Sequence, residues 1–192
     1  MNGMQGGVMK VLVTGATGYI GGRIIPRLLV DGHSVRILTR DRARALARPW
    51  GHKVEIFVGD VLQPDTLDEA LEGVDAAYYL VHSMYGGGDF AVKDRQAAEN
   101  FVVAGQRLRQ VIYLGGIVPG NEEERAASNH LESRAEVGRI LRAGLPTTEF
   151  RAGPIIGSGS ASFEMVRYLT ERLPAMIAPR WILNEVQPIS VR

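Results

Sequence analysis

The chain has 192 residues, of which 45% are hydrophobic, with a formal net charge of +1 and no cysteine. This size and composition are typical of one intracellular domain with a single core, and we expect a cytoplasmic protein. The near-neutral charge argues against a nucleic-acid binder, and the lack of cysteine excludes disulfides and thiol catalysis. No apolar run approaches the ~20 residues of a membrane span.

Short apolar segments alternate with helical patterns along most of the chain. This alternation predicts an α/β fold, a doubly wound parallel sheet with helices on both faces. Pro26 lies inside the first helical pattern, where it predicts a kink. In chain order, the expected strands are 10–14, 34–39, 53–58, 75–81, 110–115 and 147–152, and the expected helices are 18–31, 41–47, 64–72, 89–107, 129–143 and 161–172.

The two ends of the chain differ from its middle. Residues 1–8 have neither a basic segment nor an apolar core, so we expect a disordered leader there and one domain over residues 9–192. Residues 187–192 have the pattern of a strand that is just beginning. We therefore expect this domain to be truncated at its C-terminal end, with an additional C-terminal domain as one possible continuation. The sequence is compatible with both a monomer and an oligomer.

The most informative motif is GATGYIG at residues 15–21, directly after the first expected strand. Its glycines permit a tight turn, close approach of a ligand, and close packing of the next helix on the sheet. Free backbone N–H groups and the positive end of the helix dipole meet there, which suits a pyrophosphate. The motif predicts a dinucleotide site formed by Gly15, Thr17, Gly18, Tyr19, Ile20 and Gly21.

The end of the second expected strand indicates which dinucleotide is bound, because it meets the adenosine ribose in such folds. Thr39 stands where an acidic residue would accept from the 2′-hydroxyl group, and Arg40 follows it. A guanidinium suits a phosphate, so the sequence favours NADP(H) over NAD(H). Asp41 is a rival, which we assign to the N-cap of the next helix. Alternatively, Arg40 belongs to a solvated basic face.

The third expected strand is followed by Gly59-Asp60-Val61. Asp60 is placed to accept a hydrogen bond from the adenine amino group, and Val61 is placed to pack on the adenine ring. The alternative is that Asp60 is only a turn residue. We prefer the ligand interpretation, because the carboxyl ends of the strands face the ligand in an open α/β sheet.

Later strand ends are expected on the nicotinamide side of the ligand. Val81, His82 and Ser83 follow the fourth strand and should pass under the nicotinamide ribose, although a purely structural histidine is an equally good interpretation. Gly115 ends the fifth strand, and Pro154 lies in a glycine-rich loop after the sixth. Both are expected to flank the nicotinamide. Such loops can also be mobile surface connections.

With these residues placed, the chain resembles the extended and atypical short-chain dehydrogenase/reductase superfamily over essentially its whole length. The segment VTGATGYIGG at residues 13–22 resembles the nucleotide fingerprint of that superfamily, and Gly59-Asp60-Val61 resembles its adenine-binding motif. More narrowly, residues 78–84 and 157–164 are similar to a bacterial subgroup of NmrA-like, complex-I-accessory-type proteins. The resemblance implies a Rossmann fold that binds NAD(P)(H).

Active members of that superfamily use a Ser, a Tyr and a Lys, with the Tyr and the Lys four residues apart on one helix face. Here His130 and Arg134 keep this spacing but replace both residues, and the fifth strand has glycine in place of the serine. Either His130 is a substitute proton donor while Arg134 holds the ribose or the substrate, or His130 is an exposed polar residue in an idle site.

Two functions remain open on the sequence alone. One is an NADP(H)-dependent oxidoreductase that acts on an unidentified small molecule without the usual triad. The other is a non-catalytic NAD(P)(H) sensor or scaffold that regulates a partner. The missing triad favours the sensor, and the glycine-rich substrate side favours the enzyme. Nucleotide-sugar epimerisation has little support, because it also relies on the Tyr-Lys pair, and no metal site is expected.

Overall fold

The structure of the chain is a computed structural model that describes residues 7–82, 90–117, 129–172 and 187–191. The chain divides into two compact units, Met1–Phe150 and Arg151–Arg192. Of the leader expected at residues 1–8, residues 1–6 lie outside the described part.

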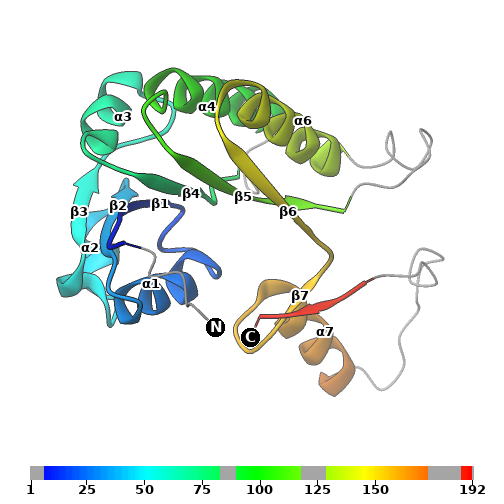
Figure 1. The fold of residues 1–192 in the computed structure, drawn as a ribbon. Helices are drawn as coiled ribbons and strands as arrows, with labels where there is room; N and C mark the ends of the chain where they lie inside the picture. Colours follow the sequence, from blue (N-terminus) through cyan, green and yellow to red (C-terminus); the bar gives the residue numbers. More distant parts are fainter. Residues whose placement is uncertain (1–6, 83–89, 118–128, 173–186, 192) are drawn as a thin grey trace, which may run out of the picture. The chain divides into compact units, whose positions relative to one another are not determined.

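The larger unit is built on one six-stranded sheet with the strand order β3-β2-β1-β4-β5-β6 (Figure 1). The pairings of β1 with β2 and β4, of β2 with β3, and of β4 with β5 are parallel. This confirms the expected parallel sheet, whose order reverses between β1 and β4. The strands are β1 (Lys10–Thr14), β2 (Ser34–Thr39), β3 (Glu55–Val58), β4 (Ala76–Tyr79), β5 (Gln110–Gly116) and β6 (Thr147–Ala152).

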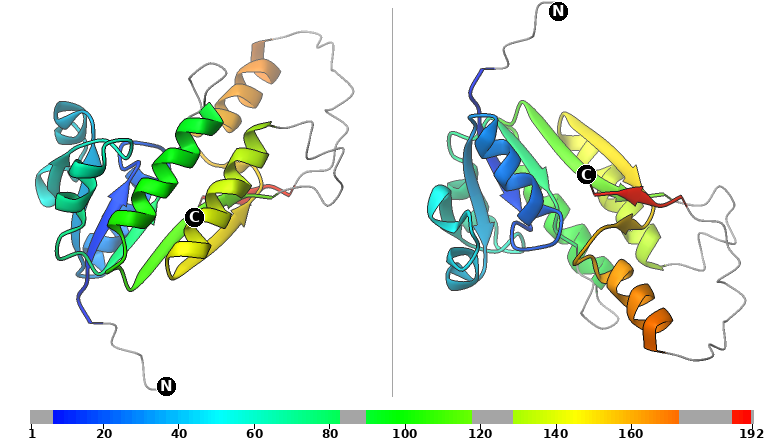
Figure 2. Two further views of the ribbon diagram at one scale, coloured as in Figure 1. Left: turned by 90° about the horizontal axis from the view of Figure 1, so that it is seen from above. Right: turned by 90° about the horizontal axis from the view of Figure 1, so that it is seen from below.

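Helices cover both faces of this sheet, as expected for a doubly wound fold. Helices α1 and α2 lie on one face, and α3, α4 and α6 lie on the other (Figure 1). Helices α4 and α6 run side by side across their face (Figure 2). The bounds are α1 (Gly21–Val30), α2 (Arg42–Leu46), a short 3₁₀ helix (Gly51–Lys53), α3 (Pro64–Leu71), α4 (Phe90–Ala104) and α6 (Asn129–Gly144).

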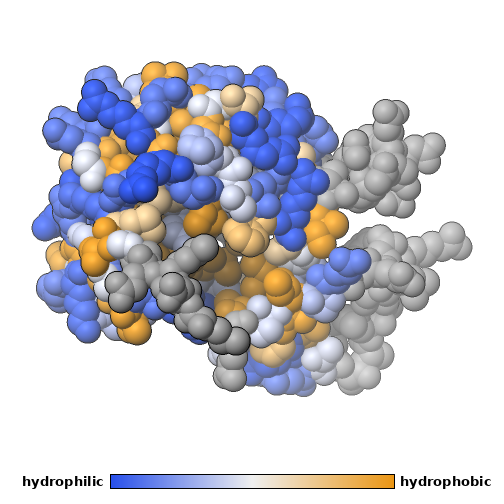
Figure 3. Space-filling model, in the orientation of Figure 1, coloured by the Kyte–Doolittle hydropathy of each residue, from blue (hydrophilic) through white to orange (hydrophobic). Residues whose placement is uncertain are grey.

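The central strands divide their side chains between two hydrophobic clusters. Val11 and Val13 pack with Ile25 under α1, whereas Leu12 packs with Phe101 under α4. Successive residues of a strand point to opposite faces, so a strand that is buried on both faces is a continuous apolar run. On the face seen in Figure 3, the surface over α3 and α4 is mostly hydrophilic with scattered apolar residues, as amphipathic helices require.

Several helix ends are set by local chemistry, and the expected capping role of Asp41 is confirmed. Gly32 follows α1 with φ +84°, and the His33 N–H donates to the Leu28 carbonyl, which together form a Schellman motif. The Asp41 carboxylate caps α2 by accepting from the Arg44 N–H at 2.9 Å. Pro64 occupies the first turn of α3. The first helix starts at Gly21 rather than at residue 18, because the glycine-rich turn occupies the residues before it.

The smaller unit contains helix α7 (Ala161–Arg172) and the short strands β7 (Ile155–Ile156) and β8 (Ile189–Ser190), which pair in parallel. The helix matches the expected range, and β8 lies in the segment expected to begin a strand. The backbone N–H of Phe163 donates to the Ser160 hydroxyl, so Ser160 caps the start of α7.

Trp50 supplies a hydrogen-bond donor that Pro26 lacks within α1. The Gly22 carbonyl would normally accept from the N–H of residue 26, but proline has none. The Trp50 indole N–H donates to this carbonyl at 3.2 Å instead, and the Trp50 side chain is buried in the cluster under α1. The helix therefore continues through Pro26 as far as Val30.

Trp50→Phe is expected to lower the free energy of unfolding by about 1–3 kcal/mol, because it leaves the Gly22 carbonyl without a donor. In a Pro26→Ala background the same change should cost less, since the new N–H at residue 26 can donate to Gly22. Urea unfolding of the four variants in a double-mutant cycle measures this coupling. Equal losses in the two backgrounds would show that the hydrogen bond contributes nothing beyond packing.

Candidate functional site

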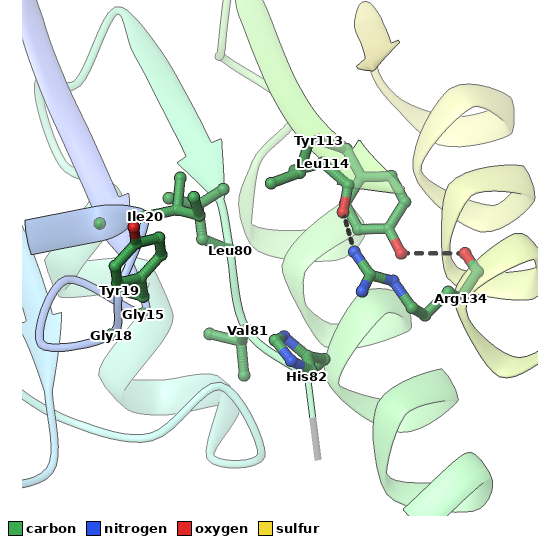
Figure 4. A pocket seen from close by; sticks show the side chains of 11 residues that line it. Gly15, Gly18, Tyr19, Ile20, Leu80, Val81, His82, Tyr113, Leu114 and Arg134 are labelled. Atoms are coloured by element: carbon green, nitrogen blue, oxygen red, sulfur yellow. Dashed lines mark hydrogen bonds between the residues drawn. The ribbon is translucent and has the colours of Figure 1, made fainter. Parts of the chain in front are cut away.

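A cleft of about 120 Å³ opens at the carboxyl ends of β1, β4 and β5, where the strand order reverses (Figure 4). Ligands of open α/β sheets bind at this position. The glycine-rich loop forms one wall, the segment after β4 forms the floor, and β5 with α6 forms the opposite wall. The lining residues are Gly15, Gly18, Tyr19, Ile20, Gly21, Leu80, Val81, His82, Tyr113, Leu114 and Arg134.

Two of the three motif glycines are required by close packing. Gly15 has φ +67°, and a Cβ atom added to it would lie 2.5 Å from the Leu80 carbonyl oxygen. A Cβ atom at Gly21 would lie 2.5 Å from the Gly15 carbonyl oxygen. Thr14 holds the two strand ends together, because its hydroxyl donates to the Tyr78 carbonyl and accepts from the Leu80 N–H, both at 3.1 Å. The expected tight turn and close helix packing are confirmed.

The loop leaves three backbone donors free at the start of α1. Among the described residues, the N–H groups of Tyr19, Ile20 and Gly21 have no protein acceptor, whereas the N–H groups of Gly18 and Gly22 bond within the loop. These three donors lie at the positive end of the helix dipole, so together they favour an anion. The residues present therefore fit the diphosphate of a dinucleotide.

The side chain of Tyr19 adds a second unsatisfied group to the same wall. Its hydroxyl is buried and has no hydrogen-bond partner among the described residues, and the Arg23 guanidinium lies over its ring, 3.9 Å from the ring centroid. Buried polar groups normally find a partner, and an unsatisfied one is often a place where a ligand or water completes the site.

The loop after β2 presents an exposed cation. The side chain of Arg40 is 81% exposed, and its Nη1 lies 3.8 Å from the Asp60 Oδ2 atom. Thr39 is buried, and its hydroxyl accepts from the Asp41 N–H at 3.2 Å. Since Asp41 accepts from the backbone at the start of α2, its carboxylate has the capping role expected from the sequence.

The Gly59-Asp60-Val61 segment forms a compact turn beside Arg40. The Asp60 Oδ1 atom accepts from the Leu62 N–H at 3.0 Å, which is the pattern of an Asx turn. Val61 is buried in the cluster under α3 and α4. Contact of Asp60 and Val61 with adenine stays a prediction, and the structure gives both residues a role in the turn and core as well.

Arg134 stands on the wall opposite the glycine-rich loop. One of its terminal nitrogens donates to the Leu114 carbonyl at 2.5 Å, and the Tyr113 hydroxyl donates to the Arg134 carbonyl at 2.9 Å (Figure 4). The Arg134 Nε atom is buried and has no hydrogen-bond partner in the part of the chain that the structure describes. Among the described residues, no carboxylate lies within ion-pair distance of this guanidinium. The cleft wall thus carries a cation with spare donors.

The two histidines expected at the site lie close together. The ring centroids of His82 and His130 are 6.1 Å apart, and Phe90 of α4 is 6.2 Å from His130. Removal of water by the surrounding protein lowers the pKa of both histidines below the ordinary value, and the positive charge of Arg134 lowers both further. Buried Asp94, which accepts from the Ser133 hydroxyl at 3.2 Å, acts in the opposite direction.

Tyr113 is buried in the core, as expected for a strand residue rather than a triad tyrosine. Burial raises the pKa of Tyr113 to about 12, although Arg134 opposes this shift. Such a phenol is a poor proton donor near neutral pH. It does not replace the tyrosine of the superfamily triad.

Besides Arg40, Asp60, Val61 and His130, the predicted site residues Thr17, Gly115 and Pro154 are not among the described residues that line the cleft. Gly115 is buried, and a Cβ atom there would lie 2.6 Å from the Glu149 Oε1 atom, so its missing side chain makes room for that carboxylate. The Thr17 carbonyl accepts a hydrogen bond from Arg48. Pro154 belongs to the smaller unit, and Ser83 lies outside the described residues. Roles for these residues toward a ligand stay predictions.

Three residues that line the cleft, Leu80, Tyr113 and Leu114, were not among the predicted site residues. All three lie at or near the carboxyl ends of β4 and β5, so the rule that ligands meet strand ends points to their positions. Within the described residues, no group of three or more His, Asp or Glu side chains is arranged to hold a metal ion. None of the described helices is both long and apolar enough to cross a membrane.

Comparison with known proteins gives relatives over different parts of the chain. The 3 beta-hydroxysteroid dehydrogenase/Delta 5-->4-isomerase of Mycobacterium tuberculosis is 29% identical over 192 residues, covering 84% of this chain and 50% of that protein. Photosystem II assembly factor Ycf39 of Synechocystis is 41% identical over 69 residues, covering 35% of this chain and 21% of that protein. The chain spans at most about half the length of these relatives.

Solved structures share the fold. Pen from Bacillus thuringiensis matches with a TM-score of 0.73 at 17% identity, covering 95% of this chain and 61% of that chain. The enzyme WbmG from Bordetella bronchiseptica, in complex with NAD, matches with a TM-score of 0.68 at 15% identity, covering 88% and 61%. A family model described as NAD(P)H-binding matches residues 15–143, about two thirds of the chain. The chain therefore belongs to the NAD(P)H-binding family and is an NAD(P)-binding Rossmann domain.

Proposed function

We propose that this domain is an NADP(H)-dependent oxidoreductase that works without the usual Ser-Tyr-Lys triad. The observation that carries the proposal is the cleft itself. It brings the free N–H groups of the glycine-rich loop together with His82 and Arg134 at the reversal of the strand order. One wall suits the diphosphate, and the other offers a cation and titratable groups for a reacting molecule.

The chain's own residues have limited tasks in this proposal. When bound, the nicotinamide supplies the electron-pair chemistry between itself and a small molecule. The loop N–H groups orient the diphosphate, while the spare Arg134 donors hold a ribose hydroxyl or an oxygen of the substrate. Val81 and Leu114 present apolar surface that excludes water from the cleft.

His130 is the proposed proton-transfer residue, one helical turn before Arg134 on α6. Because its pKa lies below the ordinary value, the neutral imidazole predominates at pH 7. A neutral histidine accepts the proton from an alcohol more readily than it supplies a proton to a carbonyl. The direction of the shift therefore supports alcohol oxidation at neutral pH. The dehydrogenase names of the mycobacterial relatives are in keeping with this direction.

The preference for NADP(H) rests on Arg40. Its exposed guanidinium follows β2 and would hold a 2′-phosphate beside Asp60, whose Oδ2 atom lies 3.8 Å away, and Asp41 is engaged in capping α2. Arg40→Asp is expected to weaken NADPH binding by about tenfold or more, because a charge-assisted contact is replaced by repulsion. NADH binding should change little. Titration calorimetry with both nucleotides measures the ratio.

Arg44→Asp is the matched control for this experiment, because it makes the same charge change on the exposed part of the next helix. If Arg44→Asp weakens NADPH binding as much as Arg40→Asp does, the preference comes from a general basic face. If Arg40→Asp leaves the NADPH affinity unchanged or raises it, the assignment of Arg40 is wrong.

A second function, a non-catalytic NAD(P)(H) sensor or scaffold, has its own support. The Ycf39 relatives are described as assembly factors, and they match in a part of the chain. NADPH oxidation against quinones, aldehydes and enones, with NADP⁺ reduction against secondary alcohols, distinguishes the two functions. Tight nucleotide binding without turnover on any substrate in this panel would favour the sensor.

A further inference from the structure

Residues after α2 reach across to the glycine-rich loop. The Arg48 side chain is half-buried, and one of its terminal nitrogens donates to the Thr17 carbonyl at 2.5 Å, across 31 positions of sequence. Two residues later, the buried Trp50 donates to the Gly22 carbonyl. These two side chains therefore contact the backbone on either side of the free N–H groups of Tyr19, Ile20 and Gly21.

The contact of Arg48 fixes the orientation of one peptide group. The Thr17 carbonyl accepts from Arg48, and the N–H of the same peptide, which belongs to Gly18, donates to the Gly15 carbonyl at 3.0 Å. In a helix the Thr17 carbonyl would accept from the Gly21 N–H, four residues later. With the carbonyl turned toward Arg48, the Gly21 N–H stays without a protein acceptor among the described residues.

The charge of Arg48 acts in the same direction as this geometry. Among the described residues, no carboxylate lies within ion-pair distance of its guanidinium. An uncompensated, half-buried cation beside the loop raises the local positive potential where an anion would bind. A charged donor also makes a stronger hydrogen bond to a carbonyl than a neutral one.

We propose that Arg48 is a positioning residue for dinucleotide binding. It acts through the Thr17–Gly18 peptide, which it holds so that the N–H groups of Tyr19, Ile20 and Gly21 remain free for the diphosphate. The inference rests on the nucleotide binding of the proposed function. It differs from the role of Arg40, which concerns the 2′-phosphate alone.

Substitutions of the two arginines are expected to differ in their effect on the selectivity between NADPH and NADH. Arg48→Met removes the contact to the loop, so it should weaken NADPH and NADH binding by the same factor, roughly tenfold. The ratio of the two affinities should stay that of the parent, whereas Arg40→Asp changes this ratio. Arg48→Lys keeps a charged donor and should recover part of the affinity. Lys53→Met removes an exposed cation from the neighbouring 3₁₀ helix and is the control.

Calorimetry with NADPH and NADH gives the affinities, and thermal unfolding of each variant without nucleotide shows that the fold is kept. Amide NMR shifts of Gly18 and Gly21 report the peptide orientation directly and should move in Arg48→Met but not in Lys53→Met. Unchanged affinities in Arg48→Met, or a loss confined to NADPH, would overturn the inference. Absence of nucleotide binding by the parent protein would instead overturn the proposed function. If Arg48→Met does not fold, the nucleotide affinities of Arg48→Lys and Arg48→Gln are compared instead. An Arg48→Lys variant that binds nucleotide no more tightly than Arg48→Gln would also overturn the inference.

Discussion

Replacement of Gly15 by alanine is expected to abolish high-affinity dinucleotide binding and to lower the free energy of unfolding by about 2–5 kcal/mol. The positive φ of +67° disfavours any side chain, and the new Cβ atom would lie 2.5 Å from the Leu80 carbonyl oxygen. The strands cannot separate cheaply, because the Thr14 hydroxyl bonds to both Tyr78 and Leu80. Urea unfolding and calorimetry with NADPH measure the two losses.

Gly32→Ala is a matched control for the cost of the backbone conformation alone. Gly32 also has a positive φ, +84°, but a Cβ atom there would meet nothing within 4 Å. This variant should lose about 1–2 kcal/mol of stability and bind nucleotide normally. If Gly15→Ala were no more damaging than Gly32→Ala, the close approach of the loop to β4 would have no energetic importance.

His130→Ala is expected to lower turnover about 10²–10⁴-fold on any substrate that the parent protein oxidises, because the proton acceptor is lost. Nucleotide affinity should stay within a few-fold of the parent, since His130 does not line the cleft. His52→Ala removes an exposed histidine of the 3₁₀ helix and should leave turnover unchanged. A turnover that survives His130→Ala would show that another group moves the proton.

The pH dependence of this turnover follows from the direction of the histidine shift. Alcohol oxidation needs the neutral imidazole, so kcat should fall as the pH drops through the pKa of His130. Because burial and Arg134 lower this pKa, the fall should come below the ordinary value of about 6.5. A fall centred above that value would contradict the environment that the structure gives to His130.

Periodicity and turn chemistry predicted the fold well, because they depend on neighbouring residues. The strands β1, β2 and β6 and helix α7 have the expected bounds. Asp41 begins its helix as expected, since capping is a local effect. Arg134, which was singled out by its four-residue spacing from His130, lies in the cleft wall.

The rest could not be predicted because it depends on contacts between distant segments. Nothing near Arg48 indicates that its side chain bonds to Thr17, and nothing near Trp50 indicates that it completes the hydrogen bonding of α1. Gly115 was expected beside the nicotinamide from its place at a strand end. The carboxylate of Glu149, from β6, occupies the space that its missing side chain leaves. Such packing is fixed only when the whole sheet has formed.

Because Gly15 lies so close to Leu80, the glycine-rich half of the cleft tolerates substitutions less well than the half formed by α6. The glycine-rich loop packs closely on β4 and α1, so a substitution of Gly15 or Gly21 disturbs the central sheet. His130 and Arg134 stand on α6, on the other side of the cleft, and both are only partly buried. Residues at those two positions can be exchanged while the nucleotide half keeps its shape. Proteins with this architecture can therefore change or lose their catalytic activity while they still bind the dinucleotide.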